Sequence, residues 1–305
     1  MIKSRFTFKQ LEAFAFVVDT GTFRGAAAAL GTTQPNISTR IAALEATLGA
    51  TLLYRDAGSV RLTAQGAEML DQTREILRAG EALLEQAGRH DLVEERLRLG
   101  VTELVACTWL QAYLRRMKQT YPNLRIELQV DLSTRIEERL VDGQLDLALQ
   151  TGPFVTDLSG SIPLGIEAYI WVAAPELAAR IGPAPKLRHL FAGPVLTHAK
   201  HTQAGMALHA KAAETGLDTT QIVHSSALSV CVPMVCEGLG VATLPRALVA
   251  DDIALGRLVA LDADWVPAPL AFYARYRAEQ APRFVTKAAA LASEASTAAS
   301  NAELP

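Results

Sequence analysis

One helical segment, which follows Thr33, carries polar side chains at a spacing that suits contact with DNA bases. Its apolar residues recur at i, i+4, i+7 and i+11, the spacing of a buried helix face: Ile37, Ile41, Leu44 and Leu48. The opposite face holds only small or polar residues: Pro35, Asn36, Ser38, Thr39, Ala42, Ala43 and Ala46. Because no bulky apolar group stands there, this face can enter a major groove, where Asn, Ser and Thr side chains reach base edges. A solvent-exposed helical hairpin of another kind of domain is the competing interpretation.

The preceding residues predict two further helices that position this one. Thr7 can cap a first helix, which ends at Gly21 and has one apolar face: Phe8, Leu11, Phe14, Ala15 and Val18. A short helix over residues 23–30 and the turn Gly31-Thr32 follow. Thr33 can then cap the third helix, with Pro35 in its first turn. Two helices joined by a short Gly-containing turn are typical of a helix-turn-helix.

The residues after the third helix predict a wing. Two short strand-like runs, 52–55 and 60–63, flank the turn sequence Asp56-Ala57-Gly58-Ser59. A β-hairpin directly after a recognition helix places Arg55 and Arg61 where they can meet phosphate or the minor groove. Solvated surface charge is the alternative for either arginine. The hairpin favours DNA binding over the other interpretation of the helices.

Charge is distributed unevenly along the chain. Residues 1–65 hold seven Lys and Arg against four Asp and Glu, a net +3, while the remaining residues carry a net −6. A mildly basic head on an acidic body suits DNA binding at one end. No stretch approaches the roughly 20 apolar residues of a membrane span, and the N-terminal residues lack the apolar core of a signal peptide. We therefore expect a cytoplasmic protein.

From Gln65 to about His90 the pattern predicts one long helix. Small residues recur every seven positions at Gly66, Thr73, Gly80 and Ala87, and between them stand the large pairs Met69-Leu70, Ile76-Leu77 and Leu83-Leu84. This alternation is a coiled-coil seam, and small residues let two helices approach closely. We therefore expect a dimerising helix, with packing against the chain's own body as the alternative.

After Asp91, strands and helices alternate, which predicts parallel sheets covered by helices. The expected strands span residues 97–101, 124–130, 145–149, 169–173, 195–197, 221–224, 240–244, 257–261 and 270–276. Helices are expected over 104–120, 133–141 and 227–238 and from about Ala281, with a frayed tail from Ser293. The breaks near 150–165 and at Pro267-Ala268-Pro269 indicate two crossings between lobes, so the last strand returns to the first lobe.

Neither cysteines nor catalytic motifs indicate an enzyme. The chain has no Gly-rich phosphate loop, no GxSxG, no HExxH and no His or Cys cluster at metal-ligand spacing, so we expect no cofactor and no metal. His198, His201 and His209 are best explained as parts of a solvated loop. Cys107, Cys231 and Cys236 form no disulfide framework, and burial as small apolar residues is the favoured role. A redox switch at Cys231 and Cys236 is an alternative that requires exposed thiols of lowered pKa.

These residues together resemble the LysR-type regulator family over nearly the whole chain. The head carries the family's pattern almost in order: Phe14, Phe23-Arg24-Gly25-Ala26-Ala27, Leu30, Thr33-Gln34-Pro35-Asn36-Ile37-Ser38, Ile41, Leu44-Glu45, Leu48-Gly49, Leu53-Tyr54-Arg55, Leu62-Thr63 and Gly66. Three later runs look like sensor-domain landmarks: Tyr121-Pro122, Leu145-Asp146-Leu147-Ala148 and Gly238-Leu239-Gly240-Val241-Ala242-Thr243-Leu244-Pro245. Tyr54 stands where the family usually has Phe, and the wing tip is less basic than most.

The resemblance implies a multidomain α+β/α/β protein. A winged helix-turn-helix over residues 1–65 and a dimerising linker helix over 66–91 precede a two-lobed sensor over 92–300 that resembles periplasmic binding proteins. Lobe I is expected over about 92–163 and 268–300, and lobe II over about 164–267. The DNA contacts are expected from Thr33, Gln34, Pro35, Asn36, Ser38, Thr39, Arg40, Arg55 and Arg61. The implied assembly is a dimer of dimers on promoter DNA, a homotetramer, with RNA polymerase as a further candidate partner.

A regulator of this kind responds to a small molecule, and the predicted strand ends indicate where it binds. Ligands of open parallel sheets settle beyond the carboxyl ends of strands, near helix N-termini. The candidate residues there are Thr102, Ser133, Thr197, His198, Ser225 and Ser226, although each can also be an ordinary helix cap. We expect a small polar or anionic metabolite, held by hydroxyls and backbone N–H groups rather than by an arginine clamp. Glu103 would compete with an anion at the same helix N-terminus.

Overall fold

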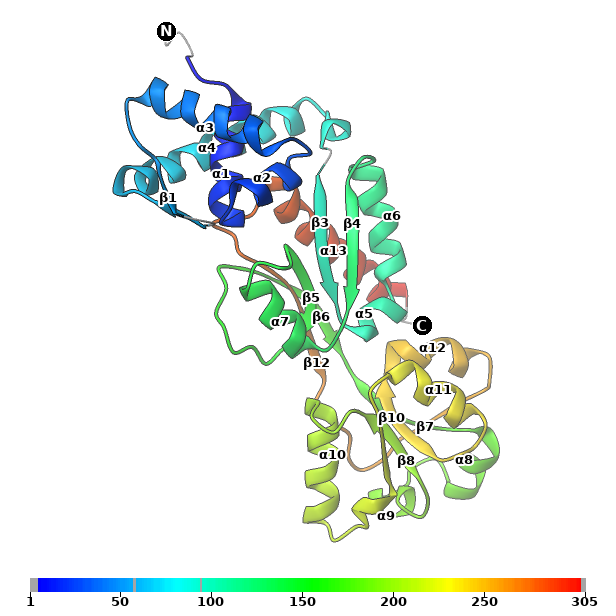
Figure 1. Ribbon diagram of the computed structural model, residues 1–305. Coiled ribbons are helices and arrows are strands. Elements are labelled where there is room, and N and C mark those ends of the chain that lie inside the picture. The colour runs from blue at the N-terminus through cyan, green and yellow to red at the C-terminus, as the bar shows by residue number, and fades with distance from the viewer. Residues whose placement is uncertain (1–4, 57–58, 94, 303–305) are drawn as a thin grey trace. The chain divides into compact units, whose positions relative to one another are not determined.

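The computed structural model describes residues 5–56, 59–93 and 95–302 (Figure 1). The chain divides after Leu92 into a small, mainly helical unit and a larger mixed α/β unit. No helix in these described ranges is long and apolar enough to cross a membrane.

The first unit is a helical cluster followed by a hairpin and a long helix. Its elements are α1 (Phe8–Thr20), α2 (Phe23–Ala29), α3 (Gln34–Leu48), β1 (Leu53–Asp56), β2 (Ser59–Leu62), α4 (Ala64–Gln86) and a 3₁₀ turn (His90–Leu92). Ile37, Ile41 and Leu44 of α3 are fully buried, as the sequence predicts. Leu48 is 38 % exposed, so the fourth expected core position is wrong. The helix ends there, and Gly49, at φ 65°, turns the chain away from the core.

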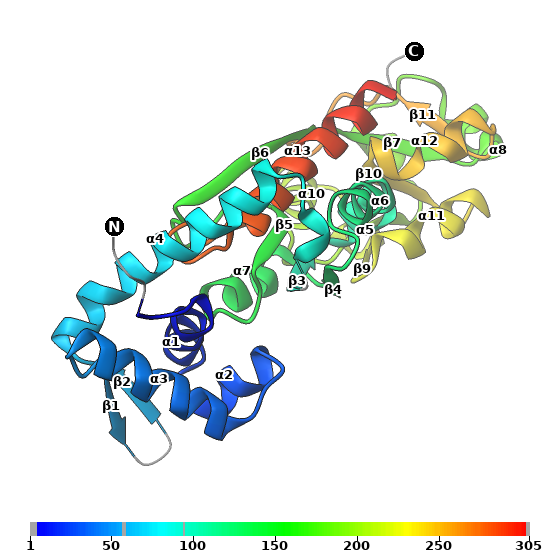
Figure 2. The same cartoon turned by 90° about the horizontal axis from the view of Figure 1, so that it is seen from above.

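The hairpin of β1 and β2 follows α3 (Figure 2), and hydrogen bonds join it to the helices both just before β1 and within β2. The Glu45 carboxylate accepts the N–H of Leu52 at 2.8 Å, and the N–H of Val60 donates to the carbonyl of Gly21 at 3.1 Å. Thr63 then begins α4 by accepting the N–H of Gly66 at 2.8 Å. The wing therefore sits in a fixed place relative to α3. The turn residues Ala57 and Gly58 lie outside the described residues.

The small residues of α4 face the chain's own body. A Cβ on Gly66 would lie 2.1 Å from the Leu52 carbonyl oxygen, one on Gly80 would lie 2.5 Å from the Phe8 ring, and Thr73 is 5 % exposed. The expectation that these residues let a partner helix approach is therefore wrong, because α1 and the start of the hairpin already occupy that face. Of the large residues, Ile76, Leu83 and Leu84 are exposed, whereas Leu70 is buried and Met69 and Leu77 pack against the core of this unit.

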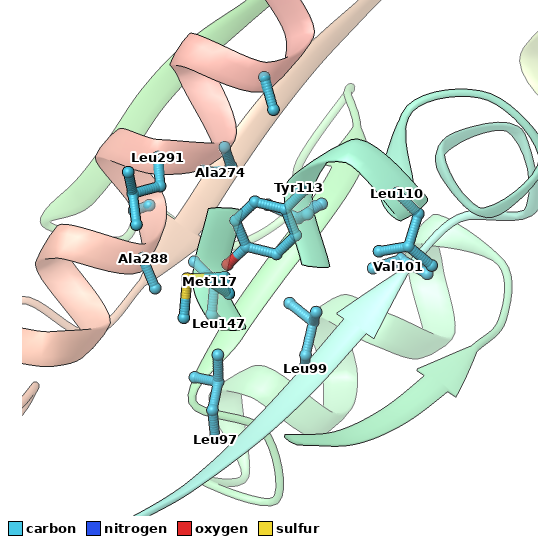
Figure 3. Close-up of a cluster of buried hydrophobic side chains, with 14 of the residues drawn as sticks. Leu97, Leu99, Val101, Leu110, Tyr113, Met117, Leu147, Ala274, Ala288 and Leu291 are labelled. Carbon is cyan, nitrogen blue, oxygen red and sulfur yellow. The ribbon is translucent and has the colours of Figure 1, made fainter. Parts of the chain in front are cut away.

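The second unit contains two five-stranded sheets. The first lobe has the order β4-β3-β5-β12-β6, and its elements are β3 (Arg96–Val101), α5 (Glu103–Cys107), α6 (Leu110–Thr120), β4 (Arg125–Val130), α7 (Ser133–Val141), β5 (Leu147–Thr151), β6 (Gly160–Glu167), β12 (Leu270–Tyr276) and α13 (Arg283–Ala302). In Figure 3, Tyr113 and Met117 of α6 pack among Leu97, Leu99 and Leu147, beside Ala288 and Leu291 of α13. The second, smaller core lies under α7.

The second lobe has the order β11-β7-β10-β8-β9. Its elements are β7 (Tyr169–Ala173), α8 (Pro175–Ile181), α9 (Leu187–Leu190), β8 (Val195–His198), α10 (Gln203–Glu214), a 3₁₀ turn (Thr219–Gln221), β9 (Ile222–Ser225), α11 (Leu228–Cys236), β10 (Val241–Pro245), α12 (Arg246–Ala254) and β11 (Val259–Leu261). Helices α8, α9 and α10 share one apolar core with the sheet, and α11 and α12 share the other. Both faces of the sheet are therefore covered.

The sheets are mixed rather than parallel. In each lobe four strands point the same way and one strand, β12 in the first lobe and β7 in the second, is antiparallel to both of its neighbours. In the first lobe β12, the strand that leads back into the lobe, runs against the βαβ units, whereas β6, the strand that leads out of it, points the same way as they do and pairs with β12. The return of the last strand to the first lobe is confirmed, because β12 pairs with β5.

Three sequence expectations need correction in this unit. Residues 160–167 form the edge strand β6 instead of a break, so the crossing falls at Ala168 rather than near 163. Pro163 is tolerated there because an edge strand has a free side, and the register shifts beside it. The helix expected over 104–120 is interrupted between α5 and α6. The tail does not fray at Ser293, because α13 continues to Ala302 and buries Ala295 and Ser296.

Candidate functional sites

The outer face of α3 is open and polar. Thr33, Gln34, Pro35, Asn36 and Thr39 are exposed, while Ser38 and Arg40 are half-buried. The helix begins after Thr33, whose carbonyl accepts the N–H of Ile37 at 3.2 Å, but the Thr33 side chain forms no capping hydrogen bond. Thr33 is therefore the N-cap residue, as predicted, with Pro35 in the first turn, but its side chain does not cap the helix.

Two of the polar side chains on this face are oriented by local hydrogen bonds, one to the turn before α3 and one within the helix. The Asn36 Nδ2 donates to the Thr32 hydroxyl at 3.2 Å, and the Thr39 hydroxyl donates to the Pro35 carbonyl at 3.0 Å. Each bond is local and exposed, so it can be exchanged for a bond to a base without opening the core. The face can therefore present amide and hydroxyl groups to a groove.

The wing carries an aromatic and basic pair. The register places Tyr54 opposite Arg61 and Arg55 opposite Val60, so the two arginines occupy neighbouring rather than facing positions. Tyr54 is 56 % exposed and Arg61 is also exposed. A tyrosine in place of the family's usual phenylalanine is accommodated without burying its hydroxyl.

In the second unit, a carboxylate of the first lobe binds the second lobe. Glu103 begins α5 at the end of β3, and its carboxylate accepts hydrogen bonds from three donors at the start of α11. These are the N–H of Leu228 at 2.7 Å, the N–H of Ser229 at 3.1 Å and the Ser229 hydroxyl at 2.6 Å. Glu103 is recognisable in the sequence as a carboxylate at a helix start, but its donors lie 125 and 126 residues away and leave no local signal.

Several polar groups without partners surround this contact. Thr102 is 9 % exposed and Thr197 is fully buried, and neither hydroxyl has a hydrogen-bond partner among the described residues. The same holds for His198 Nε2. Burial lowers the pKa of His198, an effect that nearby Glu103 opposes and His201 reinforces. We call Thr102, Glu103, Thr197, His198 and Ser229 the inter-lobe cluster.

Comparison with known families decides what this combination of units is. Residues 8–67 match the model of the bacterial regulatory helix-turn-helix protein of the lysR family, and residues 90–295 match that of the LysR substrate binding domain. The chain belongs to the LysR-type transcriptional regulators. It therefore binds DNA through its first unit and a small-molecule effector through its second, and it is not an enzyme.

Individual relatives agree with this assignment. The chain is 34 % identical over 249 residues to a probable hydrogen peroxide-inducible genes activator of Streptomyces viridosporus, covering 79 % of this chain and 78 % of the relative. It is similar in fold to ArgP of Mycobacterium tuberculosis, with a TM-score of 0.60, 22 % identity and 94 % and 96 % of the two chains covered. A full-length OxyR variant from Pseudomonas aeruginosa gives a TM-score of 0.59 at 19 % identity, with 97 % and 96 % covered.

The structure separates the predicted effector residues of this LysR-type regulator into two groups. Thr102, Thr197 and His198 belong to the inter-lobe cluster. Ser133 instead bonds to the Thr151 hydroxyl at 2.8 Å and accepts the Thr151 N–H at 3.1 Å. Ser225 bonds within its own turn, to both the carbonyl and the N–H of Ala227. Ser226 is exposed. For Ser133 and Ser225 the hydroxyl has a structural partner.

Thr243 was not predicted as a site residue, although it shares the environment of Thr197. It is fully buried, its hydroxyl has no partner in the described part of the chain, and it follows Ala242, which pairs with Leu196. Thr243 therefore lies beside Thr197 on a neighbouring parallel strand. Only the strand pairing brings the two together, so a sequence without register gives no signal for it.

A second polar network, in the first lobe, is fully satisfied. Arg275 of β12 is 2 % exposed and donates to Glu137 of α7 at 3.0 Å, while its guanidinium also bonds the Thr156 carbonyl and lies 3.8 Å from the Phe154 ring centre. Burial by itself would raise the pKa of Glu137, but the N–H groups of Thr156 and Val155 and the Arg275 guanidinium hold it below its ordinary value. This network fixes the loop between β5 and β6.

The described cavities do not include the predicted effector residues. An open groove of about 570 Å³ is lined by Arg116, Ile162, Ala290, Ser293, Glu294, Thr297 and Ala298 on the face formed by α6, β6 and α13. A cavity of about 30 Å³ lies between Leu104, Leu164 and Ala247. Neither touches the inter-lobe cluster. Among the described residues no group of three or more His, Cys, Asp or Glu side chains can hold a metal.

Proposed function

We propose that this regulator recognises its operator with the outer face of α3 and holds a small polar effector at the inter-lobe cluster. The observation that carries the first part is the polar outer face of α3, where Asn36 and Thr39 are exposed and locally bonded beside the half-buried Ser38, opposite the buried Ile37, Ile41 and Leu44. Phosphate contacts from Arg55, with Arg40 and Arg61 beside the helix, supply sequence-independent affinity.

Two substitutions test this division of roles. Asn36→Ala removes an amide that can pair with a base. It should therefore reduce the base preference at one or two operator positions and weaken the free energy of operator binding by about 1–3 kcal/mol. Arg55→Ala removes a phosphate contact, so it should weaken binding to every sequence alike and reduce the salt dependence by about one charge. Binding isotherms on operator and random duplexes over a salt series measure both. An Asn36→Ala protein with unchanged sequence preference would contradict the assignment of α3.

We infer that assembly uses the outer face of α4. Leu83 is 68 % exposed, and with Ile76 and Leu84 it forms an apolar stripe that a second copy can cover. A dimer through this stripe, and a dimer of dimers through the sensor units, is the arrangement that the family resemblance implies. It acts where promoter DNA is, in the cytoplasm, with RNA polymerase as a candidate partner beside the operator.

The effector proposal rests on the partnerless polar groups. A buried hydroxyl without a partner costs free energy, and a ligand that bonds it recovers that cost. Thr102, Thr197 and His198 supply three such groups from both lobes. A ligand that spans them would bias the relative arrangement of the lobes and thereby DNA binding. We therefore favour a small polar metabolite held by hydroxyl, imidazole and backbone groups.

A cysteine-based peroxide response, which the names of relatives in Streptomyces viridosporus and Mycobacterium avium suggest, has less support in this chain. Burial raises the pKa of the Cys107, Cys231 and Cys236 thiols, whereas peroxide-reactive thiols have a lowered pKa. Cys231 and Cys236 lie five residues apart in α11, about 7.5 Å along the axis, so a disulfide requires the helix to unwind. Regulation that survives replacement of all three cysteines by serine would remove this alternative.

A further inference from the structure

The helix α11 has no cap of its own. Its N-cap residue is Ala227, which forms no side-chain cap, and its first turn contains no acidic residue. The first N–H groups of a helix lack partners within it and carry a partial positive charge, so they favour a carboxylate. Helix α11 has nine residues. Its start is therefore an anion-binding position that the local sequence leaves open.

Glu103 fills this position from the other lobe. One carboxylate oxygen accepts the Leu228 N–H at 2.7 Å, and the other accepts the Ser229 N–H at 3.1 Å and the Ser229 hydroxyl at 2.6 Å. Two backbone N–H groups and one hydroxyl around a carboxylate are the contacts that a free carboxylic acid ligand would receive at a helix N-terminus. The protein thus supplies its own ligand to the site.

The residue beside Glu103 provides an independent indication that this is a ligand site. Thr102 immediately precedes Glu103 and is more than nine-tenths buried, yet its hydroxyl has no partner in the described ranges. On the other side, the carbonyl of Thr197 accepts the thiol of Cys231 in α11 at 3.9 Å, and the Thr197 hydroxyl is likewise buried without a described partner. Each lobe therefore has an unpaired hydroxyl near the contact: Thr102 precedes Glu103 in the chain, and Thr197 lies in the strand whose carbonyl meets Cys231 of α11.

We propose that the start of α11, with the Ser229 hydroxyl, is a carboxylate-binding site that Glu103 occupies, so that Glu103 ties the lobes together and excludes external anions. It follows that Glu103 determines the charge class of the effector. The group that an effector presents to this side of the cluster is a neutral donor or a cation, and an anionic group would have to displace Glu103. The statement about the effector rests on the proposed function, whereas the carboxylate site does not.

Acetate is the probe, because it carries the same carboxylate group as the Glu103 side chain but is not attached to the protein. Thermal unfolding of the full chain is followed in sodium acetate and in sodium chloride at equal ionic strength, with no DNA and no effector. Glu103→Ala should lower the unfolding midpoint of the sensor unit by about 2–6 °C, because a helix start loses its cap. Acetate should restore at least half of that loss saturably, while the wild type responds to the two salts alike.

Three further variants locate the effect. Adding Ser229→Ala to Glu103→Ala removes one of the three donors, so acetate should bind about fivefold more weakly. Glu103→Gln fills the same space without charge, so it should lower the midpoint but respond little to acetate. Glu176 is the matched control, since it also lies in the first turn of a helix but is exposed on α8, and Glu176→Ala should behave like the wild type.

Two results would overturn the proposal. If acetate stabilises the wild type and Glu103→Ala equally, the start of α11 is not the site that Glu103 fills. If Glu103→Ala and Glu103→Gln both unfold at the wild-type midpoint, the contact does not tie the lobes. Because neither measurement involves operator DNA or an effector, failure here and failure of the proposed function are separate outcomes.

Discussion

The buried hydroxyl of Thr197 allows a test in which stability and effector response change in opposite directions. Thr197 lies near the end of β8, is fully buried and bonds no described group through its hydroxyl. Thr197→Val replaces the hydroxyl by a methyl group of nearly the same shape. Both residues are β-branched and suit a strand, so the backbone has no reason to change.

The magnitude follows from the cost of the hydroxyl. Burying a hydroxyl without a partner costs about 1–3 kcal/mol by comparison with protein mutational data, and valine avoids that cost. We therefore expect Thr197→Val to stabilise the effector-free protein by about 1–3 kcal/mol. For a unit of about 200 residues, each kcal/mol raises the unfolding midpoint by about 2–4 °C. The effector should lose a hydrogen bond in the same variant and bind about tenfold more weakly.

Thermal unfolding without effector and calorimetric titration of candidate metabolites measure the two effects. Thr108→Val is the control, because the Thr108 hydroxyl donates to the Leu104 carbonyl at 2.6 Å and its loss should destabilise the protein. The same replacement of threonine by valine should thus raise stability at position 197 and lower it at position 108. A Thr197→Val protein that is less stable than the wild type would refute the argument from the unpaired hydroxyl. A regulating ligand that binds both Thr102→Val and Thr197→Val unchanged would place the effector elsewhere.

Two further predictions concern the parts that hold this regulator together. Arg275→Met leaves Glu137 buried without its cation and should destabilise the first lobe by about 3–5 kcal/mol, whereas the double variant Glu137→Gln, Arg275→Met should recover part of this loss in chemical denaturation. Leu83→Glu places a charge in the exposed stripe of α4 and should lower the mass measured by sedimentation. Gly80→Ala is the control: the added Cβ meets the Phe8 ring of the same chain, so the mass should not change. Equal masses for the wild type and Leu83→Glu would mean that the stripe is not an assembly surface.

The sequence predicted best those elements that have a clear pattern of apolar and polar residues or clear boundaries. The structure places α7, β7 and β12 at the predicted bounds, because α7 is clearly amphipathic and because β7 and β12 are short apolar runs bounded by polar or proline residues. The edge strand β6 was missed, since its Gly and Pro residues resemble a loop and its hydrogen bonds come from β12, more than 100 residues later. The end of α13 was missed because Ala and Ser residues resemble a frayed tail, although the first lobe buries them.

The α4 seam shows what periodicity does not determine. A seven-residue repeat indicates that a helix has two faces, but either face can be the inner one. Here Gly66 and Gly80 lie against Leu52 and Phe8 of the same chain, and the exposed large residues are Ile76, Leu83 and Leu84. The sequence carries the repeat, whereas the choice of face depends on where α1 packs. The Glu103 contact is unpredictable for a similar reason, because its donors belong to another lobe.

Whether a buried polar group is paired helps to separate structural residues from candidate ligand residues when its surroundings are polar, whereas the unpaired Tyr113 hydroxyl lies in the apolar core of the first lobe. Folded proteins satisfy nearly all buried polar groups, so an unsatisfied one calls for an explanation. Glu137 and Arg275, the most conspicuous buried charges of the sensor unit, are fully paired and therefore maintain the loop between β5 and β6. Thr102 and Thr197 are less conspicuous in the sequence, yet their hydroxyls stay unpaired beside a carboxylate that joins two lobes. An unpaired hydroxyl reduces stability without effector and becomes useful only when a ligand bonds it, and that dependence is what an effector site requires.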